Sequence, residues 1–474
     1  RALPTTETGS RRYGVTLSHR NAQDDSGGGV AATCEVVLNR RPAPSPAPLP
    51  GRLPPPPATY PDGSAMITGE GFAERLFHGP CFASIGAVGG WSETGIEVAV
   101  TAPSETGFLT PDLSGPRVIN GPLLDNAGQI LALQHKHATT RSFGLFPVLV
   151  ERIAFFGPRP EAGTPLRVVT RQVAGESTMT GDLDYRDATG RVVMRVEGMK
   201  MMFIHWPRRF EASFFRGRAG GSLAEPLEAP EGVTIRLLRG FEGSFLTTSN
   251  RIWLRSLAWA CLTAEERAAF HALPPRGPRQ EEWLLGRIAV KEAGLDALPD
   301  PDAADLLELV VAQDEGGRPT LVLPGGARLP CSISHSNGTA AGAVAAPGWA
   351  IGLDIEPIGG PDDAIWHNVL AFDASERAAL ERFGARAVWC AKEAVAKAVG
   401  TGLMGAPTRF KALLRGDALC VAVASEEIPV SFPTVEGHHL ALCHIPQSQA
   451  AGLAARLTGL AQQPERRGAA HADH

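Results

Sequence analysis

The sequence predicts an α+β protein with more than one domain, and three observations support this prediction. The chain has 474 residues, which is longer than one ordinary domain. From residue 72 to 206 one helical segment stands among strand-like segments, whereas from 232 to 446 helices and strands alternate. Stretches rich in Pro, or in Arg, Gly and Pro, separate these regions. We therefore expect the end of a preceding unit at 1–40, a Pro-rich linker at 41–62, one domain at 63–206, a second linker at 207–231, another domain at 232–446 and a flexible tail at 447–474.

Composition and charge argue against several classes of protein. The net charge of −5 does not suit a nucleic-acid binder. The seven cysteines are scattered without a C-x-x-C pair, so we expect no zinc knuckle and a reduced, cytoplasmic setting. No apolar run reaches the ~18 residues that a membrane span needs, and no signal segment is recognisable. Because the chain begins with Arg1, we expect a piece of a longer polypeptide or a processed form.

The clearest element of the 63–206 region is a helix over residues 120–134. Asn120 can cap it, Pro122 suits its first turn, and apolar residues recur at helical spacing. Strand-like runs follow it, namely "PVLVERIAFF", "PLRVVTRQV", "TMTGDLDYRD" and "VVMRVEGMKMMFI". Two more strand-like runs lie within residues 12–39. This order predicts one buried helix wrapped by an antiparallel sheet.

The stretch "WAIGLDIEP" at 349–357 is an apolar strand that ends in two acids. Side chains alternate along a strand, so the apolar residues from Trp349 to Ile355 share a core face. Gly352, Asp354 and Glu356 share the other face. Two such carboxylates can converge on one cation, and oxygen ligands of this kind suit Mg²⁺. The alternative is two exposed acids at a strand end.

A helix predicted from about 385 to 400 carries a second group of polar residues. Trp389, Glu393 and Lys397 recur at i, i+4 and i+8, so they lie on one face. The carboxylate could supply a third oxygen to the metal, and the ammonium could contact a phosphate. The alternative for the Glu–Lys pair is an ordinary surface interaction, and Trp389 is expected to pack in the core.

"IGLDIEP" followed some forty residues later by "WCAKEAVAK" resembles the signature of 4′-phosphopantetheinyl transferases. The resemblance covers about 215 residues, the size of the pseudo-dimeric, surfactin-synthetase-activator type. It implies two similar α/β halves that bind coenzyme A and Mg²⁺ between them. It also implies transfer of the phosphopantetheine arm to a serine of an acyl carrier protein or domain. Its other motifs are "RIAVKEA" (287–293), "EGGRPTL" (315–321), "CSISHSNG" (331–338) and the pair Phe372 and Glu376.

The resemblance also implies a role for individual residues. Asp354, Glu356 and Glu393 would bind Mg²⁺, and Glu393 would be the base for the incoming serine. Lys397 would contact the pyrophosphate. The nucleotide phosphates would be held by Arg287, Arg318, Ser334, His335 and Lys291. Arg318 replaces the lysine usual in the family, which keeps the charge but changes its geometry. The alternative for Arg287 and Lys291 is a solvated helix face.

The region 63–206 carries a second resemblance. "HGPCF" (78–82) followed by "LLDNAGQ" (123–129) resembles the second half of a polyketide synthase dehydratase. The implied fold is a hotdog, in which an antiparallel sheet wraps one long helix. Asp125 would be the catalytic acid, assisted by Gln129 and His78. The family's base histidine, in a His-x-x-x-Gly-x-x-x-x-Pro motif of a first hotdog, is not found in this sequence, and residues 1–40 could be the end of that first hotdog.

The order of these two regions resembles the end of an iterative type I polyketide synthase of the enediyne kind. A carrier domain would then lie upstream on the same polypeptide. The alternative is a fragment of a polyunsaturated-fatty-acid or glycolipid synthase, in which the hotdog region is a non-catalytic scaffold. We expect no nucleic-acid and no membrane partner.

Overall fold

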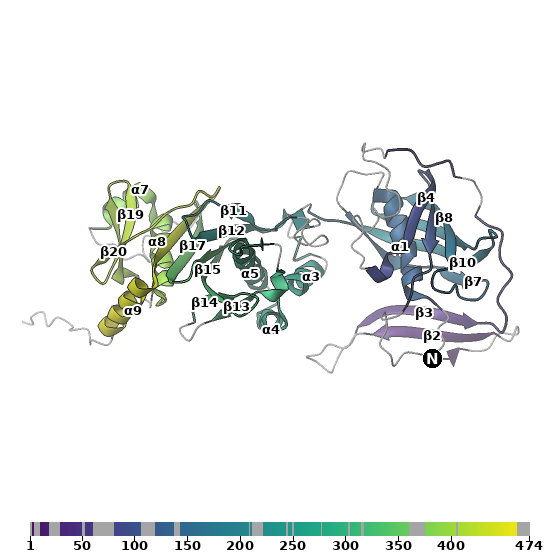
Figure 1. The fold of residues 1–474 in the computed structure, drawn as a ribbon, viewed down its shortest axis with the longest axis horizontal. Coiled ribbons are helices and arrows are strands. Elements are labelled where there is room, and N and C mark those ends of the chain that lie inside the picture. The colour runs from purple at the N-terminus through teal and green to yellow at the C-terminus, as the bar shows by residue number, and fades with distance from the viewer. Residues whose placement is uncertain are drawn as a thin grey trace, which may run out of the picture. The chain divides into compact units, whose positions relative to one another are not determined.

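The chain divides into two compact units, Arg1–Trp206 and Pro207–His474 (Figure 1). We describe each unit by itself in the computed structural model. It describes residues 2–3, 10–18, 29–49, 53–59, 80–105, 119–136, 143–207, 209–210, 221–242, 245–248, 251–275, 277–301, 304–313, 317–359, 375–403 and 406–461.

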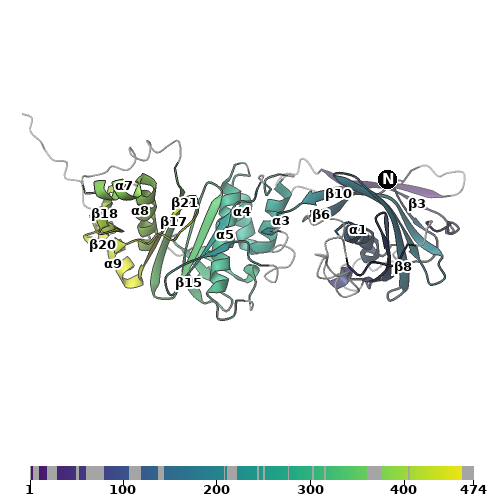
Figure 2. The same ribbon diagram turned by 90° about the horizontal axis from the view of Figure 1, so that it is seen from above.

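The first unit is built on one helix and a seven-stranded antiparallel sheet of order β4-β5-β8-β9-β10-β6, in which β7 also pairs with β10. Helix α1 (Gly121–Lys136) lies within the curved sheet (Figure 2). Asn120 caps it, because its side-chain oxygen accepts a hydrogen bond of 2.9 Å from the Leu123 amide. The predicted helix wrapped by an antiparallel sheet is therefore confirmed. The strands are β4 Ile85–Ser92, β5 Gly95–Thr101, β6 Phe143–Leu149, β7 Arg152–Phe155, β8 Pro165–Ala174, β9 Thr178–Arg186 and β10 Val192–His205.

The sequence run "PVLVERIAFF" forms parts of two strands, not one. The break falls between β6 and β7, where the Glu151 amide donates to the Glu197 carbonyl. A separate antiparallel sheet contains β1 (Ala2–Leu3), β2 (Arg11–Ser18) and β3 (Val30–Leu38). The two strands predicted within 12–39 are thus confirmed.

The Pro-rich segment predicted as a linker at 41–62 is docked on the sheet of the first unit in its described part. The Leu49 amide donates to the buried Asp184 carboxylate at 2.6 Å. Arg195 binds the same carboxylate at 2.6 Å and donates to the Ala47 carbonyl at 2.8 Å. Because proline residues do not form the regular hydrogen bonds of a helix or sheet, the carbonyls and the remaining amides of this extended segment are available to other partners. Here they bind side chains of β9 and β10.

The first half of the second unit is a six-stranded sheet of order β11-β12-β16-β15-β14-β13, with helix α5 against β12, β15 and β16. Gly342 on β16 lets α5 approach, because an added Cβ would lie 2.3 Å from the Val290 backbone nitrogen. The elements are β11 Glu225–Leu227, β12 Val233–Arg239, α3 Ile252–Cys261, α4 Ala264–Ala272, α5 Arg279–Asp296, β13 Val310–Gln313, β14 Pro319–Val322, β15 Arg328–Ser336 and β16 Thr339–Ala345.

The second half repeats the packing of a long helix on a strand. Helix α8 lies against β17 and β21, which pair antiparallel, and a separate sheet has the order β18-β19-β20. Gly352 on β17 has the role of Gly342, because an added Cβ would lie 1.8 Å from the Ala394 carbonyl oxygen on α8. The elements are β17 Trp349–Pro357, α7 Arg377–Phe383, α8 Ala385–Val399, β18 Phe410–Arg415, β19 Ala418–Val423, β20 Glu426–Pro429, β21 His438–Pro446 and α9 Gln447–Ala461.

The two long helices also carry the same buried ion pair. The sequences "AVKEA" on α5 and "CAKEA" on α8 each place one lysine in the core. Lys291 pairs with Glu266 at 2.5 Å, and Glu266 accepts the amide of Val311 on β13. Lys392 pairs with Glu376 at 2.5 Å, and Glu376 accepts the amide of Ala412 on β18. In each half a lysine therefore ties the long helix to a glutamate that also holds a strand.

Two boundaries predicted from sequence differ from the structure. The linker predicted at 207–231 contains β11, and the amides of Leu223 and Ala224 just before it donate to the buried Glu292 carboxylate on α5. The tail predicted as flexible at 447–474, in which the sequence leaves room for one short helix, begins with the 15-residue α9, whose residues Leu453 and Leu457 are buried. Both segments were judged from composition, which does not show whether a few apolar side chains find a core. Residues 462–474 lie outside the described residues.

Candidate functional site

The predicted strand "WAIGLDIEP" is β17, and it lies beside β15 (Figure 2). Ser334 Oγ donates to Asp354 Oδ1 at 2.7 Å, and Ser336 Oγ donates to Glu356 Oε2 at 3.0 Å. Both pairs have the same sequence separation of 20 residues, so the two strands run in the same direction. Further along, the Leu353 amide donates to Ser332 Oγ at 2.9 Å. Alternate serines of "CSISHS" therefore hold the two acids of β17.

Lys397 on α8 reaches the same carboxylate. Its Nζ lies 2.7 Å from Asp354 Oδ1, 3.1 Å from Ser334 Oγ and 3.0 Å from the Leu353 carbonyl oxygen. Asp354 is 6% exposed, and among the described residues its second oxygen, Oδ2, has no hydrogen-bond partner. A buried carboxylate oxygen without a partner is costly. This oxygen is therefore open to a ligand.

Glu356 and Glu393 lie near Asp354 and are both partly buried. Burial raises the pKa of Glu393, the charge of Asp354 raises it further, and Lys397 opposes these effects. Burial also raises the pKa of Glu356, and Ser336 opposes this. In the described parts of the chain no three His, Cys, Asp or Glu side chains are already arranged to hold a metal ion. The three acids are thus electrostatic neighbours, not a preformed metal cage.

Two residues next to these acids were not singled out from sequence. Ser336 binds Glu356, and the alternation of serines on β15 was a signal for it. Cys390 is buried on α8, where burial and the charge of Asp354 raise its pKa well above the usual value. Cys390 lies one helical turn before Ala394, and nothing in the sequence indicated that it would lie beside Asp354. Trp389 packs against the core of the second half as predicted.

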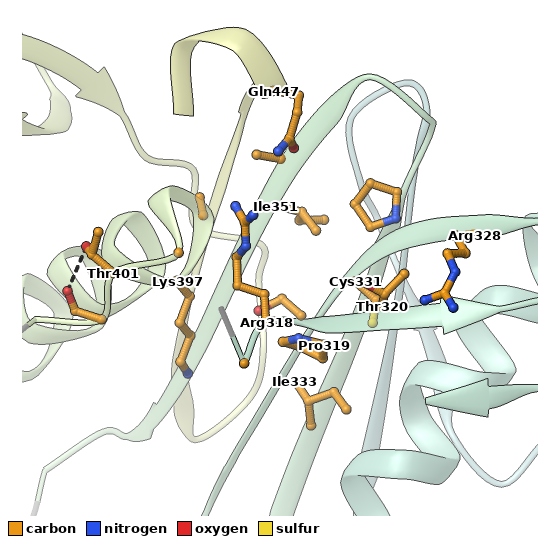
Figure 3. A pocket seen from close by; sticks show the side chains of 17 residues that line it. Arg318, Pro319, Thr320, Arg328, Cys331, Ile333, Ile351, Lys397, Thr401 and Gln447 are labelled. Carbon is orange, nitrogen blue, oxygen red and sulfur yellow. Dashed lines mark hydrogen bonds between the residues drawn. The ribbon is translucent and has the colours of Figure 1, made fainter. Parts of the chain in front are cut away.

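A pocket of ≈ 500 Å³ opens beside Lys397 in the second unit (Figure 3). Its charged lining residues are Arg318, Arg328 and Lys397, and none of the described residues that line it is acidic. Gly400, which ends α8 with a φ of 83°, makes room for Arg318, because an added Cβ would lie 2.4 Å from Arg318 Cδ. The pocket can therefore accept a polyanion. Arg328 was not identified from sequence, because it lies outside the motifs.

Other residues predicted for phosphate binding lie on the opposite face of β15. His335 Nδ1 is 3.5 Å from Glu282 Oε2 on α5, and burial lowers the pKa of His335 although Glu282 opposes this. The Arg287 guanidinium lies over the Trp283 ring at 3.5 Å, and burial lowers its pKa to about 10. The charge of Lys397, which lines the cationic pocket, lowers the pKa of His335 further, so the two side chains are electrostatic neighbours.

Lys291 is a correction to the sequence-based set. Its ammonium is fully buried, pairs with Glu266 and donates to the Cys261 carbonyl at 2.8 Å. Both the predicted phosphate contact and the alternative of a solvated helix face are wrong for Lys291, because its ammonium is buried and paired with Glu266. Glu376 is likewise a core residue, and Phe372 lies outside the described residues.

The first unit has a pocket of its own, of ≈ 720 Å³, lined mainly by apolar side chains. Asp125 and Gln129 on α1 both line it, and Gln129 Nε2 donates to Asp125 Oδ2 at 2.7 Å. The helical spacing of four residues thus brings the two together as expected. Burial and then the charge of Asp125 raise the pKa of the nearby Tyr185. His78, the third predicted residue, lies outside the described residues.

None of the helices in the described parts of the chain is both long and apolar enough to cross a membrane.

Two family models match separate parts of the chain. Residues 64–205 match the polyketide synthase dehydratase N-terminal domain. Residues 350–443 match the 4′-phosphopantetheinyl transferase superfamily. A curated relative, the holo-[acyl-carrier-protein] synthase of Exiguobacterium sibiricum, is 40% identical over 85 residues, which are 18% of this chain and 65% of the relative. The match thus spans slightly less than two thirds of that relative's length.

Solved structures similar to part of the chain are dehydratase domains. One is from a mycocerosic acid synthase-like polyketide synthase, with 19% identity, a TM-score of 0.30, and coverage of 42% of this chain and 65% of that chain. Another is from the CurH module of the curacin polyketide synthase, with 15% identity, a TM-score of 0.31, and coverage of 43% and 68%. A third is from PpsC of Mycobacterium tuberculosis, with 18% identity, a TM-score of 0.30, and coverage of 42% and 68%.

Proposed function

We propose that this chain, in which a polyketide synthase dehydratase-like region precedes a 4′-phosphopantetheinyl transferase superfamily domain, transfers the phosphopantetheine arm of coenzyme A to a serine of an acyl carrier protein or domain. The observation that carries the proposal is the meeting of Ser334, Asp354 and Lys397 from three elements, beside a pocket whose charged lining residues, among those that the structure describes, are cationic. Such a site suits a nucleotide with several phosphates. The name of the curated relative supports the same activity.

The carboxylates of the site fit a divalent cation. Asp354 Oδ2 is buried without a partner, and the charge of Asp354 raises the pKa of both Glu356 and Glu393. A cation among them would relieve both the unpaired oxygen and the repulsion. Asp354, Glu356 and Glu393 would therefore hold Mg²⁺, which favours carboxylate oxygens together with substrate phosphates. When bound, Mg²⁺ would neutralise the negative charge that grows on the leaving group.

Individual residues of the site would then have separate roles in the reaction. The serine oxygen forms a bond to the phosphorus that carries the pantetheine arm, the bond to the bridging oxygen breaks, and 3′,5′-adenosine bisphosphate leaves. Glu393, which lies near Asp354 and Lys397, accepts the serine proton. Lys397 and Arg318 bind phosphate oxygens, and Ser334 holds Asp354 in place. Arg287 and His335 stay predicted contacts of the nucleotide phosphates, and His335 is an electrostatic neighbour of Lys397.

Mass spectrometry of the carrier tests the transfer. The chain is incubated with coenzyme A, Mg²⁺ and an apo-carrier protein, and the carrier should gain one phosphopantetheine group. Asp354→Ala and Glu393→Ala should each abolish this gain while the variants keep the native fold, as judged by circular dichroism. Glu381→Ala, at an exposed position on α7, is the matched control and should transfer normally. A carrier that gains no mass with the unaltered chain would exclude the proposed activity, and normal turnover in Asp354→Ala or Glu393→Ala would exclude the metal site.

For the first unit we propose an acyl-binding role within a polyketide synthase. The apolar pocket suits an acyl chain, and Asp125, held by Gln129, stands at its wall as the acid that would expel a β-hydroxyl as water. For catalysis, a histidine base would come from a first hotdog, and the carrier domain would lie upstream on an enediyne-type polypeptide. The second candidate is a non-catalytic scaffold in a polyunsaturated-fatty-acid or glycolipid synthase. In the intact polypeptide, where a first hotdog would supply the base, water loss from a β-hydroxyacyl-pantetheine thioester that Asp125→Asn abolishes would favour catalysis. Binding without water loss in the same polypeptide would favour the scaffold.

A further inference from the structure

We propose that Arg209 and Phe210, which lie in the segment predicted as a linker, are positioning residues of the proposed transfer site. They fix the end of β12 and, through it, the turn that carries Ser336, and Ser336 holds Glu356 for the cation. This role rests on the transferase activity and the metal site proposed above. Both residues belong to the second unit, and both lie outside the sequence motifs and the matched region 350–443.

Phe210 is fully buried in an aromatic cluster of the second unit. Its ring centroid lies 4.9 Å from that of Phe245, 5.8 Å from that of Phe241 and 5.9 Å from that of Trp253, each in an edge-to-face arrangement. Rings in this arrangement attract one another beyond the burial of their apolar surface. The segment is therefore anchored to the second unit by its own side chain.

Arg209 binds the end of β12 next to this cluster. Its Nη2 donates to the Arg239 carbonyl at 2.7 Å and to the Gly240 carbonyl at 3.5 Å. Its guanidinium also lies over the Phe241 ring, 4.7 Å from the centroid. A guanidinium can donate hydrogen bonds and stack on a ring at the same time. Arg209 and Phe210 together therefore hold the residues on both sides of Gly240.

Gly240 in turn binds the turn between β15 and β16. Its amide donates to the Gly338 carbonyl at 2.7 Å, and an added Cβ on Gly240 would lie 2.9 Å from the same oxygen. Asn337 and Gly338 both have a positive φ, of 49° and 74°, as in a tight two-residue turn. Ser336 and Thr339 pair across this turn. A shift of Gly240 would therefore be passed on to Ser336.

Ser336 completes the connection, because its Oγ donates to Glu356 Oε2 at 3.0 Å. Glu356 is partly buried and is one of the three acids proposed to hold Mg²⁺. A hydrogen bond of this kind orients a carboxylate that binds a metal, and its loss commonly lowers metal affinity about tenfold to a hundredfold. A continuous series of contacts thus connects Arg209 and Phe210 to a proposed metal ligand.

Calorimetric titration with Mg²⁺ tests this role. Phe210→Ala should weaken Mg²⁺ binding about threefold to tenfold, which is less than the loss expected for Ser336→Ala itself. The Mg²⁺ concentration for half-maximal transfer should rise by the same factor, whereas KM for coenzyme A at saturating Mg²⁺ should stay unchanged. Phe210→Leu, which keeps an apolar side chain in the cluster, should recover most of the affinity.

A double variant separates positioning from a general loss of stability. If Phe210 acts through Ser336, Phe210→Ala/Ser336→Ala should bind Mg²⁺ only as weakly as Ser336→Ala alone. The matched control is Leu457→Ala, which opens a cavity beneath α9; it should lower the melting temperature and leave Mg²⁺ binding unchanged. If Phe210→Ala does not fold, Arg209→Met gives the same test, because it keeps Phe210 and removes the hydrogen bond to Arg239.

Unchanged Mg²⁺ affinity in Phe210→Ala and Arg209→Met would overturn the positioning role. Losses for Phe210→Ala and Ser336→Ala that add in full would overturn it as well. If the unaltered chain binds no Mg²⁺, the proposed metal site fails, and the role of these two residues fails with it. If the unaltered chain binds Mg²⁺ but transfers nothing, only the proposed activity fails, and the calorimetric comparison still decides the positioning role.

Discussion

Replacing Lys392 with methionine should destabilise the second unit strongly, although Lys392 lies outside the proposed site. Lys392 and Glu376 are each 1% exposed at their side chains, and their charged atoms are 2.5 Å apart. Removing one partner of a buried pair leaves the other charge uncompensated, which costs about 3–5 kcal/mol. In a domain of this size, that corresponds to a fall of about 6–20 °C in melting temperature. Thermal unfolding followed by circular dichroism measures it.

The double variant Lys392→Met/Glu376→Gln should recover most of this loss. The glutamine oxygen can still accept the Ala412 amide that Glu376 accepts now, and no buried charge remains. Lys291→Met should behave like Lys392→Met, because its pair with Glu266 is buried to a similar extent.

Arg415→Met breaks an ion pair in which both side chains are exposed, so it should leave the melting temperature almost unchanged. Equal melting temperatures for Lys392→Met and Arg415→Met would refute the view that burial decides how much stability is lost when an ion pair is broken.

Two further predictions concern packing and thiol chemistry. Gly352→Ala should lower the free energy of unfolding by at least about 3 kcal/mol and impair transfer, because the new Cβ would meet backbone atoms of α8 at 1.8 and 2.5 Å. Gly452 on α9 has open space around it, so Gly452→Ala should instead raise the free energy of unfolding by about 0.5–1 kcal/mol. Denaturant unfolding measures both variants. A similar loss of stability in Gly352→Ala and Gly452→Ala would contradict the close approach of β17 and α8. At pH 8 a thiol reagent should label the native chain at the exposed Cys34 and Cys81 and more slowly at Cys420, and it should reach four buried cysteines only after unfolding. Burial raises the pKa of three of these to about 12 and that of the fourth well above its usual value, so the reactive thiolate is scarce at pH 8; rapid labelling of native Cys443 would contradict this. The four are Cys261, Cys331, Cys390 and Cys443.

Local sequence signals predicted correctly those features that depend on residues close together along the chain. Asn120 predicted the start of α1, and α8 at Ala385–Val399 matches the helix predicted from about 385 to 400. The strand pattern of "WAIGLDIEP" was right for Ile351, Leu353 and Ile355, which are buried. It was wrong for Trp349, which is 38% exposed and stacks on His444. Alternation shows which face a side chain is on, but not how far the core extends along the strand.

By itself, the sequence determined the elements and the chemistry of the conspicuous residues: paired acids on a strand, a Glu–Lys face on a helix, and an acid and an amide one turn apart on α1. These depend on spacing along one segment, and spacing is visible in sequence. Only the tertiary structure decided which charges are available. It buried Lys291 in a core ion pair, turned His335 toward Glu282, and set Arg328 at the wall of a cationic pocket. The physical reason is that the availability of a charge depends on burial and on partners from distant segments, and neither is encoded in the spacing of neighbouring residues.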